Sequence, residues 1–200
     1  MTVASQWMAD HVAGAGHRVD ALVPLGVDTA RFRPRAGGPG PADRLIQVAD
    51  LNRVKDHQTM LAALALARAE RPTLTLDLLG TDTLHGRLVH QVARLGLVDA
   101  VRFHGPVSSQ AVASALGGSV LHVLSSLHDA GPVAVLEAAA CGLTTVGTAV
   151  GHVADLAAAS PPGAVAVPVA DPAALARAVL DLVADDGRRQ ALAERARAFA

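Results

Sequence analysis

Two cations stand close together in the segment Asp50–Asp56, directly after an apolar run that is typical of a buried strand. They are Arg53 and Lys55, and Lys55 is the only lysine among the 200 residues. A guanidinium group and an ammonium group at the end of a strand could together bind a diphosphate. A solvated surface loop is the alternative interpretation of the same residues.

The turn from His128 to Pro132 precedes a predicted helix and could bind an anion. The first N–H groups of a helix have no partner within the helix, and they carry a partial positive charge. Because Pro132 has no N–H, Gly131, Val133 and Ala134 would have to donate. An ordinary capped turn is the alternative, since every protein with a doubly wound sheet has several turns of this kind.

Glu137 lies in the apolar stretch Val133–Ala140 and is one of three glutamates in the chain. A carboxylate among apolar residues costs free energy unless it is hydrated or hydrogen-bonded. Glu137 could therefore accept hydrogen bonds from the hydroxyl groups of a ligand. The alternative is that it faces water on the outer side of its helix.

Short apolar runs alternate with longer helical patterns, and these elements must position the polar residues. Strands are predicted at residues 44–49, 74–80, 101–105, 119–125, 144–149 and 164–169. Helices are predicted at 57–70, 84–95, 108–116, 132–141, 152–159, 171–185 and 187–199, with Pro132 as a first helical residue. The alternation predicts the α/β class with a Rossmann-like, doubly wound parallel sheet. Ligands of such a sheet bind outside the carboxyl ends of its strands.

The chain divides into three parts by composition. Residues 1–33 are too few for a domain, and they are expected to form one helix around Trp7 and one strand around Val19–Leu25. The glycine- and proline-rich segment 34–43 is interpreted as a linker or surface loop. Residues 44–200 hold the full set of predicted strands and are long enough to bury a core of their own.

Composition excludes several classes of function. A net charge of −1 and 2% aromatic residues argue against a nucleic-acid partner. Glu137 and Asp155 interrupt the most apolar stretch, so no membrane span is expected, while peripheral contact with a membrane stays open. The single cysteine and the lack of a signal peptide predict a cytoplasmic chain. The histidines lack the spacing of metal ligands, and the motifs of dinucleotide sites, P-loops and serine nucleophile elbows are missing.

Taken in order, several segments resemble the pattern of glycosyltransferase family 4, in the C-terminal, nucleotide-sugar-binding domain of a GT-B enzyme. Residues Pro24–Pro34 look like the family's P-x-G-V-D-x-x-x-F-x-P segment, and Gly80 falls in its short G-x-G loop. Asp129 and Glu137 have the spacing of its E-x7-E motif, and Gly147–Gly151 match the strand and glycine turn that follow. The resemblance covers nearly the whole chain.

The resemblance implies a protein that binds a nucleotide diphosphate sugar without a metal or other cofactor and transfers the sugar with retention. Lys55 would contact the diphosphate, and Arg53 would be a second cation there. Glu137 would accept hydrogen bonds from the ribose hydroxyl groups, and Asp129 would face the donor sugar as the catalytic carboxylate. The sugar and phosphates would be approached by the backbone at Gly131, Pro132 and Val133 and by the Gly80 loop.

Three departures from the family pattern affect these expectations. Asp50 stands where the family usually has a phosphate-binding arginine, and a carboxylate there would repel a diphosphate. Asp129 replaces a glutamate, which shortens the side chain by one methylene group. The acceptor domain of the family is essentially absent from residues 1–33.

We therefore predict the donor-binding half of a hexosyltransferase-like enzyme, a truncated chain that is inactive unless an acceptor domain is supplied in trans. Residues 1–33 would then be a remnant of the acceptor domain. A degenerate, non-catalytic module that binds a nucleotide or a protein partner is the main alternative. A different GT-B protein, such as a sugar-nucleotide epimerase or a phosphorylase-like protein, is the other.

Overall fold

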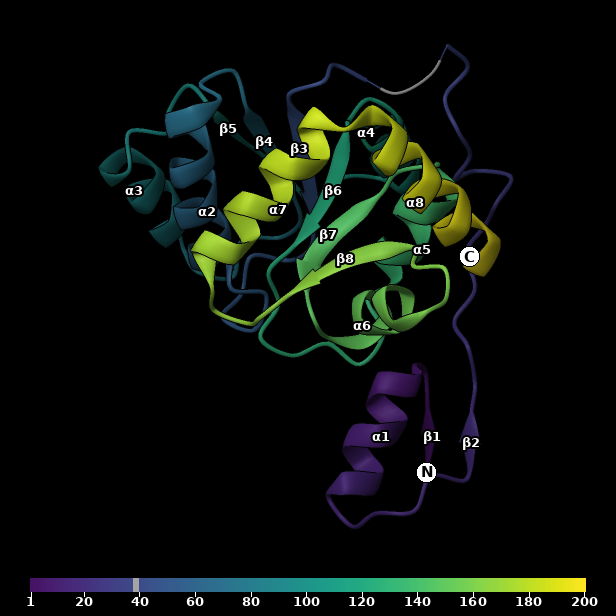
Figure 1. Ribbon diagram of the computed structural model, residues 1–200. Helices are drawn as coiled ribbons and strands as arrows, with labels where there is room; N and C mark the ends of the chain where they lie inside the picture. The colour runs from purple at the N-terminus through teal and green to yellow at the C-terminus, as the bar shows by residue number, and fades with distance from the viewer. Residues whose placement is uncertain (38–39) are drawn as a thin grey trace.

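A six-stranded parallel sheet forms the centre of the protein in a computed structural model that describes residues 1–37 and 40–200 (Figure 1). Its strands are β3 (Arg44–Val48), β4 (Thr75–Leu79), β5 (Val101–Gly105), β6 (Leu121–Leu124), β7 (Thr145–Thr148) and β8 (Ala164–Val167). Neighbouring residues of one strand, such as Leu45 and Ile46, belong to hydrophobic clusters on opposite faces, and both are fully buried. The inner strands β6 and β7 are buried at every position because both faces of the sheet are covered, whereas the edge strand β5 alternates in burial.

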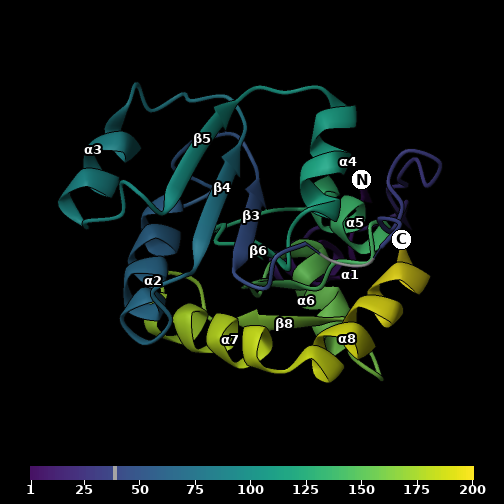
Figure 2. The ribbon, with the colours of Figure 1, turned by 90° about the horizontal axis from the view of Figure 1, so that it is seen from above.

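Helices cover both faces of the sheet (Figures 1 and 2). One face packs against α2 (His57–Glu70), α3 (Arg87–Arg94) and α7 (Pro172–Ala184). The other packs against α4 (Ser109–Gly117), α5 (Val133–Ala140) and α6 (Gly151–Ala158), while α8 (Asp186–Phe199) packs beside α5. This architecture confirms the predicted α/β class and the doubly wound parallel sheet.

The strand order reverses between β3 and β6. The strand order is β5-β4-β3-β6-β7-β8. The chain therefore adds β4 and β5 on one side of β3, and then places β6, β7 and β8 in turn on its other side. Leu45 of β3 pairs with Leu121 of β6 in parallel register. Such a reversal point is where α/β sheets bind ligands, because the loops after the two strands diverge there.

The N-terminal residues form a small separate unit that Figure 1 shows beside α6. Strands β1 (Thr2–Val3) and β2 (Ala21–Leu22) pair in parallel around α1 (Gln6–Gly14). The predicted helix is thus present, whereas only Ala21–Leu22 of the predicted 19–25 strand pairs with a neighbour. Of the predicted linker 34–43, the described residues form turns and irregular structure, and residues 38–39 lie outside the described residues.

Apart from α2, the predicted helix starts differ from the structure by one residue in five helices and by three residues in α3. The helix expected from residue 84 begins at Arg87, because the Asp82 carboxylate accepts hydrogen bonds from the N–H groups of Leu84 and Gly86 and holds a turn there. Pro132 has an extended conformation and precedes α5 as its N-cap, so the first helical residue is Val133.

Candidate functional site

The loops that follow β3 and β6 are hydrogen-bonded to each other at the reversal point. Ser125 Oγ donates to the Lys55 carbonyl oxygen at 2.9 Å, and the Leu127 N–H donates to the Val54 carbonyl oxygen, with an N–O distance of 2.8 Å. Asn52 Oδ1 accepts from the Lys55 N–H at 3.0 Å and fixes the turn that carries the lysine. The two loops therefore form one structured edge.

Lys55 and Asp129 form an ion pair across this edge. The side chains are 23% and 13% exposed, and the residues stand 74 positions apart in the sequence. The structure thus brings two predicted site residues into direct contact. Because the ammonium group already has a partner, an anion that binds Lys55 must share it with Asp129 or displace Asp129.

Glu137 lies half-buried on α5, and burial raises the pKa of its carboxyl group. In the described part of the chain, its carboxylate has no hydrogen-bond or ion-pair partner. Burial, together with the negative charge of Glu137 one helical turn before it, raises the pKa of the Cys141 thiol to about 11. Glu137 is therefore a desolvated acceptor that a ligand hydroxyl group could satisfy.

The start of α5 has unused donors. Among the described residues, the N–H groups of Gly131, Val133 and Ala134 have no acceptor, while Val135 donates to the Pro132 carbonyl oxygen at 3.1 Å. Val133 is 43% exposed, so the end of the helix is open to water. Free amides at a helix N-terminus next to Asp129 fit the predicted approach to a phosphate or sugar.

The loops after β3 and β4 touch at Gly80 and Asp50. A Cβ atom at Gly80 would lie 2.2 Å from the Ala49 carbonyl oxygen, so only glycine fits this approach. Asp50 Oδ1 accepts a hydrogen bond from the Thr81 N–H at 2.8 Å. The carboxylate that departs from the family pattern therefore anchors the Gly80 loop, a role that the sequence did not reveal.

Arg53 lies apart from the Lys55–Asp129 pair. Its exposed side chain lines a cavity of about 260 Å³ together with Arg87, and Lys55 does not line this cavity. Arg53 and Lys55 therefore do not line one common cavity in this structure, and their joint diphosphate site stays a prediction.

A ring cluster beside the site was not predicted. The Trp7 ring stacks on His11, with 5.2 Å between ring centroids, and meets the His128 ring edge-on at 5.3 Å. Ser5 Oγ also donates a hydrogen bond to the Ala130 carbonyl oxygen. The N-terminal unit therefore packs directly on the loop that carries Asp129. The only tryptophan of an aromatic-poor chain was the one signal for this contact.

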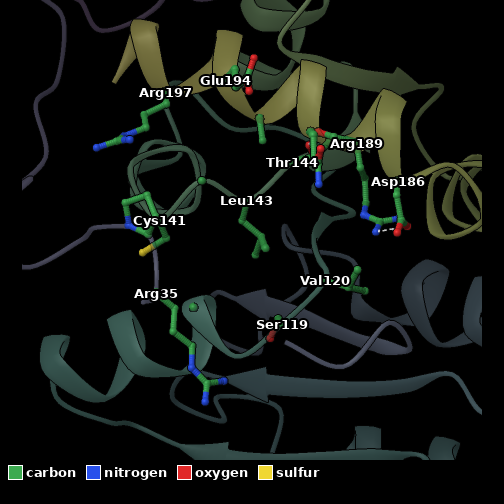
Figure 3. A pocket seen from close by; sticks show the side chains of 15 residues that line it. Arg35, Ser119, Val120, Cys141, Leu143, Thr144, Asp186, Arg189, Glu194 and Arg197 are labelled. Carbon is green, nitrogen blue, oxygen red and sulfur yellow. Dashed lines mark hydrogen bonds and ion pairs between the residues drawn. The ribbon is translucent and has the colours of Figure 1, made fainter. Parts of the chain in front are cut away.

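Another cavity, of about 250 Å³, lies at the opposite edge of the sheet (Figure 3). Ser119 and Thr144, which precede β6 and β7, line it together with Cys141. In Figure 3 the Arg35 and Arg197 side chains point away from its centre, and Arg189 pairs with Asp186. None of the predicted site residues lines this cavity, so it is separate from the candidate site.

No helix within residues 1–37 and 40–200 is long and apolar enough to cross a membrane. In the same residues, His, Cys, Asp and Glu side chains form no group of three or more that could hold a metal ion.

The chain matches the family model described as "Glycosyl transferases group 1" over residues 28–199. It is 32% identical over 206 aligned residues to the D-inositol 3-phosphate glycosyltransferase of Salinispora arenicola, which covers 92% of the chain and 46% of that protein. It is 31% identical over 180 residues to the glycogen synthase of Mycobacterium tuberculosis, covering 88% of the chain and 43% of that protein. The chain thus spans less than half the length of these curated relatives.

Solved structures share the fold. The sucrose-phosphate synthase of Thermosynechococcus elongatus superposes with a TM-score of 0.85 at 24% identity, over 98% of the chain and 52% of that protein. Anabaena Alr3699/HepE, in complex with UDP and glucose, gives 0.82 at 19% identity, over 99% of the chain and 57% of that protein. The C-terminal domain of a glycosyl transferase group 1 family protein (LpcC) from Francisella tularensis gives 0.74 at 20% identity, over 86% of the chain and 95% of that domain.

Proposed function

The chain belongs to the glycosyl transferases group 1 family, and from this premise we propose that it forms the donor-binding half of a retaining glycosyltransferase. The observation that carries the proposal is the edge between β3 and β6, where Lys55, Asp129 and the free amides of α5 meet at the reversal point of the sheet. The donor is a nucleotide diphosphate sugar. UDP-bound relatives of the same fold, such as Alr3699/HepE, support this class of ligand.

The reaction breaks the bond between the sugar C1 and the diphosphate oxygen and forms a bond from C1 to an acceptor oxygen on the same face. Negative charge develops on the leaving diphosphate, which the acceptor proton finally neutralises. Lys55 and the N–H groups of Gly131 and Val133 would stabilise this charge. They would do so without a metal ion, which is why we propose a metal-independent reaction.

Asp129 and Glu137 would hold the rest of the donor. Asp129, at the mouth of the loop, would face the sugar and orient its hydroxyl groups. Glu137 would accept hydrogen bonds from the ribose hydroxyl groups, which recovers part of the free energy that its burial costs. An acceptor domain would supply the other wall of the cleft, and without it we expect no transfer.

A non-catalytic nucleotide-binding module is a second candidate. The Lys55–Asp129 ion pair favours it, because a lysine that is held by a carboxylate binds a diphosphate more weakly. In this case the chain would bind nucleotide but would not transfer sugar in any context.

Calorimetric titration of the purified chain with UDP, GDP and ADP tests donor binding. We expect one nucleotide to bind, and Lys55→Ala or Glu137→Gln to weaken it by ~1–3 kcal/mol, as for a lost charge-assisted hydrogen bond. Glu70→Gln is the matched control, since Glu70 is exposed at the far end of α2. Glu137→Gln should not lower the unfolding midpoint, because ionising a carboxyl whose pKa is raised by folding costs stability above its ordinary pKa. Unchanged affinity in both variants would contradict the assignment.

Transfer is tested by fusing the chain to the acceptor domain of a relative. We expect no product from the chain alone, product from the fusion, and loss of product with Asp129→Ala. Nucleotide binding without transfer in the fusion would favour the non-catalytic module.

A further inference from the structure

A polar cavity of about 260 Å³ is lined in part by the β3–α2 loop, the same loop that carries Lys55. Its walls come from that loop, from the start of α3 and from the loop after β6. The residues that line it are Asn52, Arg53, Asp56, His57, Gln58, Leu84, Arg87, Leu88 and Leu127. Lys55, Asp129 and Glu137 do not line it, so the proposed function leaves this cavity without a role.

Two guanidinium groups in this cavity have no carboxylate partner among the described residues. They belong to Arg53 and Arg87, which come from separate elements of the sheet edge. Some other arginines are paired, such as Arg44 with Asp77 and Arg189 with Asp186, whereas further exposed arginines, Arg94 among them, also have no carboxylate partner among the described residues. The only acid in the lining is Asp56, and its oxygens accept from the Thr59 N–H at 3.3 Å and the Thr59 hydroxyl group at 2.6 Å. The lining residues therefore carry one positive charge in excess, and the Asp82 carboxylate on the turn before α3 also acts on the His57 wall.

His57 adds an unsatisfied buried group to the same wall. The residue is 1% exposed, and neither ring nitrogen has a hydrogen-bond partner in the described part of the chain. Burial and the nearby Lys55 charge lower the pKa of His57 to about 4, so the ring is neutral at neutral pH and carries one N–H donor. A buried donor without an acceptor is rare in proteins and costs free energy. His57 therefore places an unsatisfied donor in the wall of the cavity, with less than 1 Å² of accessible surface on each ring nitrogen.

The first turn of α2 completes the set of donors. The helix has 14 residues and begins at the cavity, at His57. Asp56 caps it by accepting from the Thr59 N–H, whereas the N–H groups of His57 and Gln58 have no acceptor among the described residues. The positive end of a helix favours an anion at this position.

We propose that this cavity binds the phosphate group of a small phosphate monoester, at a site separate from the sugar donor. A dianion with three terminal oxygens matches two guanidinium forks, which each bind such oxygens in pairs. The cavity has the volume of several water molecules, each of which takes about 30 Å³ in the liquid. It is therefore larger than a phosphate group needs. The apolar side chains of Leu84, Leu88 and Leu127 would line the remaining space, beside the organic part of the ligand.

The test is titration of the full chain at low ionic strength with inorganic phosphate and with glycerol 3-phosphate, followed by ³¹P NMR and calorimetry. We expect one saturable site for both probes, with glycerol 3-phosphate bound at least as tightly as phosphate. Arg53→Gln and Arg87→Gln should each weaken binding of both probes about tenfold. Arg94→Gln is the matched control, because Arg94 is exposed on the same helix as Arg87 and does not line the cavity.

Two further arms separate this site from the donor site. Lys55→Ala should leave phosphate binding within about twofold, and UDP should not displace glycerol 3-phosphate. The proposal is overturned by the absence of saturable binding, by equal loss in the Lys55 variant, by displacement with UDP, or by rejection of glycerol 3-phosphate when phosphate binds. Because the probes contain no nucleotide, failure here leaves the proposed donor site untouched, and failure of donor binding leaves this site untouched.

Discussion

At the level of single residues, the ion pair between Lys55 and Asp129 would couple diphosphate binding to sugar recognition in the proposed donor site. The same carboxylate that would face the sugar compensates the ammonium group that would hold the diphosphate. Binding of a donor must therefore rearrange the pair, and the free amides of Gly131 and Val133 offer the diphosphate a second set of donors while this happens.

Removing the charge of Asp129 should strengthen the binding of a nucleoside diphosphate that carries no sugar. In Asp129→Asn the competition for Lys55 is lost, and we expect about two- to fivefold higher affinity, the range for a partly exposed ion pair. Calorimetry with the nucleotide that binds the unchanged chain measures this effect. Asp181→Asn, an exposed change on α7, is the control and should have no effect. Equal or lower affinity of Asp129→Asn would mean that the pair does not oppose diphosphate binding.

The sequence could place Lys55, Asp129 and Glu137 at one edge of a sheet, because βαβ units bring the carboxyl ends of strands together. It could not predict that Lys55 pairs with Asp129 or that Asp50 bonds to Thr81. Both contacts join loops from different units, and they depend on the order of the strands and on side-chain conformations.

At the level of elements, strands and helices with long apolar patterns were predicted well. The predicted helix 57–70 matches α2, and the order of strands and helices from residue 44 onward is as expected. The apolar pattern failed where hydrogen bonds from a single side chain set the start of a helix. The Asp82 carboxylate holds a turn before α3, so this helix begins only at Arg87. The apolar pattern also missed β1, because two residues give no periodicity and pair only with Ala21–Leu22.

Gly80 should be essential for joining the loops after β3 and β4. A methyl group there would meet the Ala49 carbonyl oxygen at 2.2 Å, and the backbone has φ of 150°, which favours glycine. We expect Gly80→Ala to lower the free energy of unfolding by about 2 kcal/mol or more. Gly187→Ala in α8 is the matched control, since the nearest atom to its added carbon is 3.6 Å away, an ordinary contact, and alanine favours a helix. Urea titration followed by circular dichroism measures both; equal stability of the two variants would remove the packing argument.

Over the whole molecule, the structure consists of a large body around the six-stranded sheet and a small N-terminal unit. The body buries clusters on both faces of the sheet, whereas only Val3 and Ser5 are buried among residues 1–22. The unit is held by few contacts, in which Asp155 of α6 accepts from the N–H groups of Gln6 and Trp7 at 2.9 and 2.8 Å. Because the same unit touches the Asp129 loop through Ser5 and Trp7, its attachment bears on the candidate site.

The small unit should detach before the body unfolds. Trp7 is the only tryptophan, so its fluorescence follows this unit, while circular dichroism follows the body. We expect the fluorescence transition at a lower urea concentration and a single cooperative transition by circular dichroism, since one continuous sheet joins the body. Asp155→Ala should shift only the fluorescence transition to lower urea, with a loss of ~0.5–2 kcal/mol in the free energy of detaching the unit, as for a lost helix cap. Asp181→Asn, the control, should shift neither transition. If the two transitions coincide and Asp155→Ala shifts both, the unit and the sheet fold as one body. The contacts of Trp7 with the Asp129 loop would then be as stable as the core itself.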